Sequence, residues 1–299
     1  MRKKMLFIYN PHAGKSSISN KLSDIIQMFC SADYEVTIYA TQGQKDASNL
    51  VIELGEDYDY IVCSGGDGTL NEVTDGLMHL EKRPPCGYIP AGTVNDFASS
   101  LRIPKIMRKA AEIVVDGHFF TCDIGKFNDR HFTYVAGFGA FTEVSYETPQ
   151  NKKNMLGRMA YVLEGAMSIP NIKSYHLRLE YDGKIIEDDF LFGMVTNSFS
   201  IAGFKAFTGV RHVKLNDGIF EVVFIKMPKS ALDLQATINC IMAREADPEY
   251  VYFFRTSDLM VCCDEEDIQW TLDGESGGSC KKAHITNERG AIEIAIPKP

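Results

Sequence analysis

The stretch Gly65-Gly66-Asp67-Gly68-Thr69 places three glycines around one aspartate. A short apolar run precedes it, and apolar residues spaced as on one face of a helix follow it. A strand, a glycine-rich turn and a helix N-terminus form a site for phosphate, because backbone N–H groups reach the oxygens and the helix dipole favours negative charge. Asp67 would repel a phosphate, and a bound Mg²⁺ would resolve that conflict. The alternative is a tight turn that needs positive φ, although one glycine would suffice for that.

Three further acidic motifs carry residues that could do chemistry. Asn95 and Asp96 follow Ala91-Gly92-Thr93, where turn and N-cap roles are the alternative. Asp217-Gly218 is equally typical of a hairpin turn. Asp273-Gly274-Glu275 also suits a hairpin, but its second acid, after a strand that carries the only Trp, favours a functional role.

The first half of the chain alternates apolar strands with amphipathic helices. Strands are predicted at 5–9, 35–39, 60–63 and 87–89, and helices at 22–29, 47–54, 70–77 and 106–114. This alternation predicts a Rossmann-like parallel sheet with helices on both faces. Ligands bind such sheets at the carboxyl ends of the strands. Four polar or glycine-rich segments fall there: Asn10–Lys15, Thr41, Gly65–Thr69 and Ala91–Asp96.

From about residue 121 the strands follow one another without regular helices. Predicted strands are 132–136, 175–181, 190–196, 219–225, 251–254, 259–262, 268–272 and 292–296, with helices only at 156–167 and 231–242. Polar and apolar residues alternate over 175–181, as they do in half-buried strands. The second half is therefore predicted to be mainly antiparallel β, in a sandwich.

Composition excludes several classes of protein. A chain of 299 residues is long for one core, and its net charge of −9 argues against general nucleic-acid binding. No stretch approaches the about 20 apolar residues of a membrane span, and the first apolar run is too short for a signal peptide. The 8 cysteines lack CxxC spacing, which is typical of a cytosolic protein with reduced thiols. The 7 scattered histidines argue against a histidine-based metal site.

The motifs NPHAGK, GGDGT, PAGTVNDFA, Asp123-Ile124-Gly125, LNDGIFEV and LDGE, in this order, resemble the diacylglycerol kinase catalytic-domain family. The soluble bacterial lipid kinases are the most similar subgroup. GGDGT is shared with NAD kinases, whereas LDGE is kept by lipid kinases, including sphingosine kinases. The resemblance implies an α/β nucleotide-binding domain at 1–123 and a β-sandwich lipid-binding domain at 124–287, with ATP in the cleft between them. The last strand, about 288–299, is a candidate to return to the first domain.

The resemblance also implies roles for individual residues. Nucleotide contacts fall on Asn10, Thr41, Gly65, Gly66, Asp67, Gly68, Thr69, Asn71, Thr93, Asn95 and Asp96. Asp273 is the expected general base, Glu275 lies close to the nucleotide, and Asp67 serves the catalytic Mg²⁺. A structural Mg²⁺ is expected on the Lys214 and Ile219 carbonyls and the Asp217 carboxylate, with Asp123 and Asp96 in the surrounding hydrogen-bond network. One departure is Thr133-Tyr134, near which many relatives carry Asn.

The implied activity is an ATP- and Mg²⁺-dependent lipid kinase that phosphorylates a diacylglycerol-like alcohol to phosphatidic acid. Alternatives are another lipid alcohol (a sphingoid base, ceramide or phosphatidylglycerol), NAD, or a nucleotide sensor without turnover. Such an enzyme is expected in the cytoplasm, in peripheral contact with the inner face of the membrane. Candidate basic contacts are Lys15, Lys152, Lys153 and Arg158, with ordinary solvated lysines as the alternative. A homodimer is a further expectation from the family.

Overall fold

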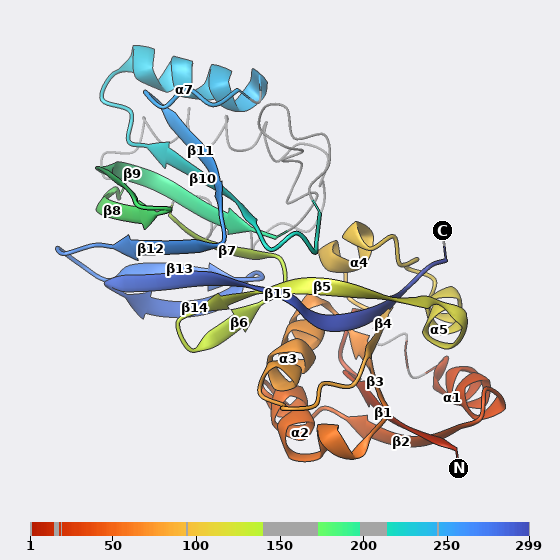
Figure 1. Cartoon of the computed structure of the whole chain (residues 1–299). Helices are drawn as coiled ribbons and strands as arrows, with labels where there is room; N and C mark the ends of the chain where they lie inside the picture. The colour runs from red at the N-terminus through yellow and green to blue at the C-terminus, as the bar shows by residue number, and fades with distance from the viewer. Residues whose placement is uncertain are drawn as a thin grey trace. The chain divides into compact units, whose positions relative to one another are not determined.

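The chain divides into two compact units. Residues 1–124 and 289–299 form the first unit, and residues 125–288 form the second. The computed structural model, drawn in Figure 1, describes residues 2–14, 18, 20–93, 95–139, 173–197, 214–243 and 245–298. Two strands, β5 (His118–Phe127) and β15 (Lys282–Ile296), each begin in one unit and end in the other.

The first unit contains a parallel sheet in the order β4–β3–β1–β2. The strands are β1 (Lys3–Tyr9), β2 (Tyr34–Ala40), β3 (Tyr60–Gly65) and β4 (Cys86–Pro90). The end of β15 adds to β4 in parallel, with Ile294 opposite Cys86. These strands confirm the predicted parallel sheet. Apolar runs such as Met5–Ile8, which is fully buried, form the strands that lead to the carboxyl edge of the sheet.

Two pairs of helices cover this sheet. α2 (Asp46–Leu54) contacts α3 (Asp67–Met78), and α1 (Leu22–Ser31) contacts α5 (Met107–Asp116). The two pairs lie on opposite sides of the strands in Figure 1. All six residues of β3 are buried, as expected for a strand covered on both faces. The predicted helices on both faces are confirmed.

The second unit is built from antiparallel strands. Its main order is β14–β13–β7–β9–β8–β12–β15, with β10 between β9 and β11 and with β6 beside β5. The bounds are β6 (Arg130–Phe132), β7 (Val135–Gly139), β8 (Tyr175–Tyr181), β9 (Lys184–Thr196), β10 (Phe220–Lys226), β11 (Val251–Thr256), β12 (Asp258–Cys262), β13 (Ile268–Leu272) and β14 (Glu275–Cys280). Aromatic rings fill the core, where Trp270 and Phe138 lie 5.0 Å apart by centroid. The antiparallel second half is thereby confirmed.

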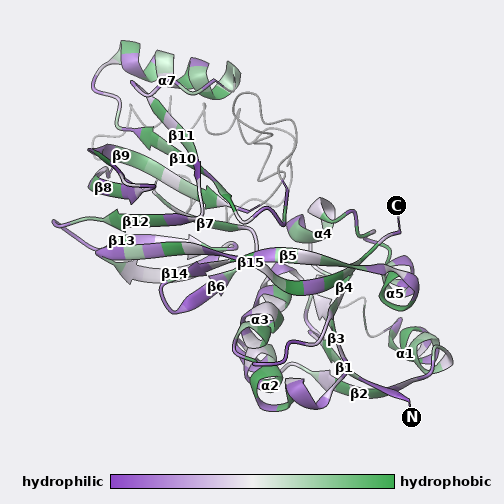
Figure 2. Ribbon diagram, viewed as in Figure 1, coloured by the Kyte–Doolittle hydropathy of each residue, from purple (hydrophilic) through white to green (hydrophobic). Residues whose placement is uncertain are grey.

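One helix, α7 (Ala231–Ala243), follows β10. Its start is fixed by a reciprocal cap in which Ser230 Oγ accepts the Asp233 N–H at 3.1 Å and Asp233 accepts the Lys229 N–H at 3.0 Å. Asp233 is its one charged residue, and hydrophobic residues colour much of the helix in Figure 2. No helix of the described residues is long and apolar enough to cross a membrane.

The structure differs from the sequence expectation at several elements. The predicted strand 132–136 is two strands, β6 and β7, separated by a bend at Thr133-Tyr134 whose N–H groups bond to Asp273 instead of to a neighbouring strand. β14 and the short helix α4 (Asp96–Ser100) were not expected, and β14 carries mostly exposed Gly and Ser without an apolar alternation. The predicted helix 156–167 lies outside the described residues.

Candidate functional site

The loops after β1, β3 and β4 meet at one edge of the first unit's sheet. In the strand register Tyr9 is opposite Ser64, and Ser64 is opposite Ile89, so these strands end level. Backbone bonds then tie the loops together: Asn10 N donates to Ser64 O at 2.8 Å, and Ala91 N donates to Gly65 O at 2.7 Å. We call residues 10–14, 65–69, 91–93 and 95 the glycine edge. Thr41, directly after β2, also reaches it, because Thr41 N donates to Tyr9 O at 2.9 Å.

Close backbone approach explains the glycines of this edge. A Cβ on Gly92 would lie 2.6 Å from Gly66 Cα, and a Cβ on Gly14 would lie 2.4 Å from Ala91 O. A Cβ on Gly65 would lie 2.3 Å from Thr69 Oγ1. Gly66 has a φ of −85°, which any residue can adopt, so the alternative of a turn that needs positive φ is wrong there. The glycines let one loop lie against the next, and this leaves backbone N–H groups at the start of α3 for a phosphate.

Asn95 holds the loop after β4 in place through side-chain hydrogen bonds. It is 2% exposed and has a φ of 54°, and its Nδ2 donates to Gly92 O at 2.6 Å while Gly92 N donates to its Oδ1 at 3.1 Å. The Tyr88 hydroxyl lies 3.2 Å from both Asn95 Oδ1 and Gly65 O. Asn95 therefore positions the loop, and its expected nucleotide contact stays a prediction. Sequence reasoning missed Tyr88, because a tyrosine in an apolar strand gives no separate signal.

Asp67 is the first residue of α3 and is half-buried. Its Oδ1 accepts the Phe97 N–H at 3.4 Å, which links α3 to α4. Burial raises the pKa of Tyr88, and the negative charge of Asp67 raises it further. A carboxylate at this helix N-terminus, beside a phosphate-binding turn, suits a Mg²⁺ that bridges acid and phosphate. Asp96, which directly precedes Phe97 and is also half-buried, is the first residue of α4.

The residues after Asp67 support the edge from α3. Asn10 Nδ2 donates to Thr69 Oγ1 across a long 3.5 Å, and both Thr69 and Thr41 are buried. Glu72 was not singled out from the sequence, yet it accepts the Lys45 N–H at 2.8 Å and the Ala47 N–H at 3.2 Å, capping α2. A glutamate on a helix gives no local sign of such a contact. Asn71 is half-buried and Thr93 is exposed, so the structure leaves Thr93 accessible to a ligand.

Asp273 lies in the second unit, in the two-residue turn between β13 and β14. Asp273 and Gly274 have φ values of 49° and 89°, as a hairpin turn of this length requires. The Asp273 carboxylate accepts at least four hydrogen bonds: from Thr133 N at 2.5 Å, Thr133 Oγ1 at 2.8 Å, and the N–H groups of Tyr134 and Val135 at 2.9 Å each. The residue is 5% exposed. Burial raises the pKa of the Asp273 carboxyl, and these bonds oppose that rise.

The hairpin and functional interpretations of this motif therefore do not exclude each other. Asp273 shapes the turn through its backbone and is enclosed by donors through its side chain. Glu275 is the first residue of β14 and is exposed, so its carboxylate can meet a ligand. The Thr133-Tyr134 departure from the family pattern turns out to supply the donors to Asp273.

The predicted structural metal site lies in a turn before β10. Asp217 Oδ1 accepts the Ile219 N–H at 3.2 Å, and Oδ2 accepts from Arg255 Nη2 at 2.7 Å. Arg255 Nε also donates to Glu221 Oε1 at 3.2 Å, while Glu221 Oε2 is buried and has no hydrogen-bond partner in the described part of the chain. Burial raises the pKa of Glu221 to about 7, although Arg255 opposes the rise.

A Mg²⁺ at this turn stays a prediction. Mg²⁺ prefers oxygen ligands, and Glu221 Oε2 is a buried oxygen without a hydrogen-bond partner in the described part of the chain, whereas both Asp217 oxygens already accept hydrogen bonds. The Asp217 carboxylate and the Lys214 and Ile219 carbonyls would hold the ion. Sequence reasoning missed both partners: Glu221, on β10, belongs to the motif LNDGIFEV but was not singled out, and Arg255, on β11, reaches the turn only in the folded chain.

Asp123 is fully buried in β5, where its Oδ1 accepts the Gly290 N–H at 2.7 Å. Both residues belong to the first unit, so Asp123 fastens the returning strand β15 to β5. A buried carboxylate is stable only when it is paired or hydrogen-bonded. Its expected part in the metal network stays a prediction.

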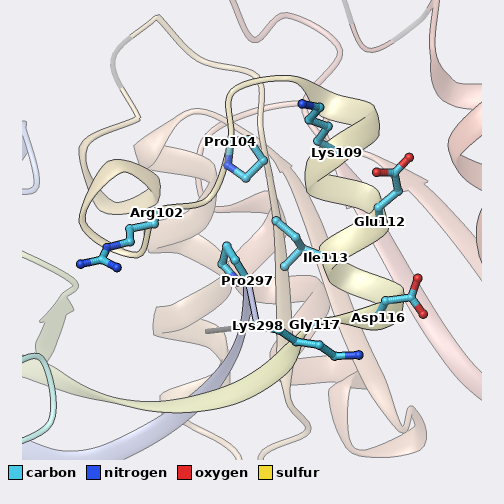
Figure 3. A pocket seen from close by; sticks show the side chains of 9 residues that line it. All are labelled: Arg102, Pro104, Lys109, Glu112, Ile113, Asp116, Gly117, Pro297 and Lys298. Atoms are coloured by element: carbon cyan, nitrogen blue, oxygen red, sulfur yellow. The ribbon is translucent and has the colours of Figure 1, made fainter.

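A separate hollow of about 460 Å³ lies beside α5 and the end of β15. Figure 3 shows Pro104, Ile113 and Pro297 at its centre, with charged side chains such as Lys109 and Asp116 around them. None of the residues that line it was predicted as a site residue. Its mixed charges point to no particular ligand, so the glycine edge and the Asp273 hairpin remain the candidate sites.

The fold and these two candidate sites define an α/β unit with a glycine-rich edge that suits phosphate, joined in the chain to an antiparallel β unit that holds an enclosed acid. Residues 4–127 match the model of the diacylglycerol kinase catalytic domain. The diacylglycerol kinase of Bacillus subtilis strain 168 is 34% identical over 298 residues, covering 99% of this chain and 97% of that protein. The diacylglycerol kinase of Staphylococcus aureus strain Newman is 36% identical over 302 residues, covering 99% and 93%.

Solved structures agree with these relatives. The crystal structure of a diacylglycerol kinase from Bacillus anthracis strain Sterne has a TM-score of 0.74 and 25% identity, over 99% of this chain and 97% of that chain. A second structure from the same organism has a TM-score of 0.79 and 29% identity, over 99% of this chain and 95% of that chain. The chain belongs to the diacylglycerol kinase family, which is a family of lipid kinases, and the resemblance stated from its motifs is confirmed.

Proposed function

We propose that this protein transfers the γ-phosphate of ATP to the hydroxyl of a diacylglycerol-like lipid, with Mg²⁺, to give phosphatidic acid. The observation that carries the proposal is the Asp273 carboxylate, buried in the LDGE hairpin and fixed by donors from residues 133–135. An alcohol needs a base as it attacks phosphorus, and a positioned carboxylate can take its proton. The names of the relatives support the choice of acceptor.

Each unit supplies one requirement of phosphoryl transfer. The first unit offers phosphates the backbone N–H groups of the glycine edge and the start of α3, which stabilise negative charge without reorganisation. Asp67 would hold the catalytic Mg²⁺, which neutralises charge on the phosphates. The second unit would supply the base Asp273, and its exposed Glu275 is the proposed contact to the nucleotide.

Product analysis tests this assignment against its alternatives. The full chain is incubated with γ-labelled ATP, Mg²⁺ and mixed micelles that contain diacylglycerol, a sphingoid base, ceramide or phosphatidylglycerol, with NAD as a parallel acceptor. We expect label in phosphatidic acid. Label in another phospholipid would move the proposal to that lipid alcohol, label in NADP would replace it with an NAD kinase, and no transfer would contradict it.

The metal part of the proposal has its own test. Thermal melting in EDTA and after added Mg²⁺ reports the structural ion through stability, while activity reports the catalytic one. We expect Mg²⁺ to raise the melting temperature, and Asp217→Asn to reduce that rise while Asp182→Asn, on the β8–β9 hairpin, keeps it. An unchanged melting temperature would argue against an ion held by Asp217.

Peripheral contact with the inner face of the membrane is also part of the proposal. Lys15, Lys152, Lys153 and Arg158 lie outside the described residues. Within the described chain, α7 supports a contact, since Leu232 is 82% exposed and Met242 is 56% exposed on one helix. Flotation with vesicles of neutral lipid and diacylglycerol should recover the protein, and Leu232→Ser with Met242→Ser should reduce recovery. Equal recovery of this variant would remove α7 from the contact.

A further inference from the structure

The donors around Asp273 fill the acceptor capacity of its carboxylate. Oδ2 accepts both the N–H and the hydroxyl of Thr133, and Oδ1 accepts the N–H groups of Tyr134 and Val135. An ionised carboxylate has about four lone-pair positions. An alcohol that must donate its own hydrogen bond to this base therefore finds the positions occupied.

Of the four donors named here, all from the described part of the chain, three cannot withdraw. They are backbone N–H groups, and the backbone beyond them is held in the sheet, where Val135 is opposite Thr196 and Val135 O accepts the Asp273 N–H at 2.8 Å. The Tyr134 hydroxyl also donates to Asp273 O at 3.0 Å, which holds the same bend. Among these four described donors, the Thr133 hydroxyl is the one that can leave by rotation about a single bond.

We propose that the Thr133 hydroxyl is the donor that the acceptor alcohol displaces from Asp273 Oδ2. This proposal rests on the proposed function, because displacement matters only if Asp273 takes a proton from an alcohol. The rotated hydroxyl can bond to a nearby backbone carbonyl, as threonines commonly do. The alcohol then donates to Oδ2 in the direction that the Thr133 hydroxyl had occupied.

The chemical step balances around this exchange. The alcohol oxygen forms a bond to the γ-phosphorus of ATP, and the bond from that phosphorus to the leaving oxygen of ADP breaks. The alcohol proton passes to Asp273 Oδ2. Thr133 neither gains nor loses a proton, so it is a positioning residue. Its hydroxyl orients the Asp273 carboxylate before the alcohol binds and then gives up its hydrogen bond to Oδ2.

The sign of the expected effect follows from the hydrogen bond. A donor to the ionised carboxylate lowers its pKa, so removing the donor raises that pKa. The variant Thr133→Val keeps the shape and removes the hydroxyl. We expect its Asp273 pKa to rise by about one unit, and the acid limb of kcat/KM to move to higher pH by the same amount. Thr133→Ser keeps the donor and should titrate as the native protein does.

Two measurements on the full chain test the proposal. Carbon NMR of labelled aspartate, assigned with Asp273→Asn, gives the pKa of Asp273 directly, and labelled ATP with diacylglycerol micelles gives kcat and KM against pH. Thr133→Val should retain kcat above the raised pKa and show an equal or lower KM for the lipid. A Thr133→Val protein that melts like the native one but is inactive at every pH would make Thr133 a proton relay and overturn the proposal.

An unchanged Asp273 pKa in Thr133→Val would overturn it as well. If that variant does not fold, Thr133→Cys retains a weak donor and should give a smaller rise in the same direction. The NMR titration needs no lipid, so it separates the two proposals. Failure of the native protein to phosphorylate a lipid alcohol would reject the proposed function, whereas an unmoved pKa would reject the role of Thr133 alone.

Discussion

Asp67 and Asp273 both follow the end of a strand, yet their surroundings differ. Asp67 is half-buried at a helix N-terminus and accepts a long 3.4 Å bond from Phe97 N. Asp273 is 5% exposed and accepts bonds of 2.5 to 2.9 Å from three successive residues. The first suits an acid that binds a cation. The second suits an acid whose direction must be fixed before a proton arrives.

The two regions also reach their precision by different means. In the glycine edge the backbone can be placed because side chains are absent, since a Cβ on Gly92 would lie only 2.6 Å from Gly66 Cα. In the Asp273 hairpin the side chain is placed by donors from the bend between β6 and β7 and from the first residue of β7. Substitutions that add atoms should therefore damage the first region, and those that remove or exchange polar atoms should damage the second.

The largest expected effect is that of Asp273→Asn. It removes the base and turns an amide NH₂ toward backbone N–H donors, so kcat should fall by about 10²- to 10⁴-fold. Asp182→Asn is the matched control, since Asp182-Gly183 is a hairpin turn of the same kind, with φ values of 46° and 72°. Labelled phosphatidic acid measures both. A near-native rate in Asp273→Asn, with ATP binding intact, would show that Asp273 is not the base.

Next in size is Gly92→Ala. Its Cβ would meet Gly66 Cα at 2.6 Å, and backbone cannot move aside as a flexible side chain would, so the free energy of unfolding should fall by about 1–3 kcal/mol. ATP affinity should fall with it, because both loops belong to the glycine edge. Gly43→Ala is the control, with nothing within 4 Å of its Cβ. Equal melting temperatures and equal ATP affinity for the two variants would break the comparison.

The contrast also shows which features could be predicted from sequence. Periodic apolar residues predicted the strands and helices around Asp67, and the order of the motifs predicted the family. Three features could not be predicted: the bend at Thr133-Tyr134, the contact of Tyr88 with Asn95 and the contact of Arg255 with Glu221. In each, no helix or strand periodicity runs through the sequence from one polar partner to the other. Such contacts leave no local pattern in the sequence. The departure from the family pattern at Thr133-Tyr134 nevertheless falls at one of these contacts, the bend that bonds to Asp273.

Asn95→Gly sharpens the comparison, with a smaller effect. Glycine adopts the φ of 54° without strain, so this variant removes the side-chain bonds to Gly92 and to the Tyr88 hydroxyl and leaves the backbone conformation in place. Gly92 N still donates to Gly65 O, but the loss of a partner by Gly92 O and by a buried tyrosine hydroxyl should lower the free energy of unfolding by about 1–2 kcal/mol. Calorimetry should also show weaker ATP binding. If stability falls while ATP affinity is unchanged, the Asn95 side chain stabilises the fold but is not needed for the shape of the glycine edge.

The smallest effect belongs to an exposed contact in the second unit. His176 Nδ1 lies 2.8 Å from Asp189 and Nε2 lies 3.4 Å from Glu187, and the bond to Asp189, followed by that to Glu187, raises the pKa of His176. A raised pKa contributes stability that is complete below the ordinary histidine pKa and is lost as pH rises through the folded value.

The His176 side chain is 48% exposed, so solvent screening should keep this contribution below about 1 kcal/mol. His176→Gln should therefore lower the melting temperature slightly at pH 5 and not at pH 8, whereas Thr133→Val changes the titration of an enclosed acid. A His176→Gln loss as large at pH 8 as at pH 5 would mean that packing, and not charge, holds β8 to β9 there. The acids of the two units differ in how far each is removed from water. The Asp189 and Glu187 side chains are exposed, Asp67 is half-buried and Asp273 is 5% exposed, so the same negative charge should have its largest effect at Asp273.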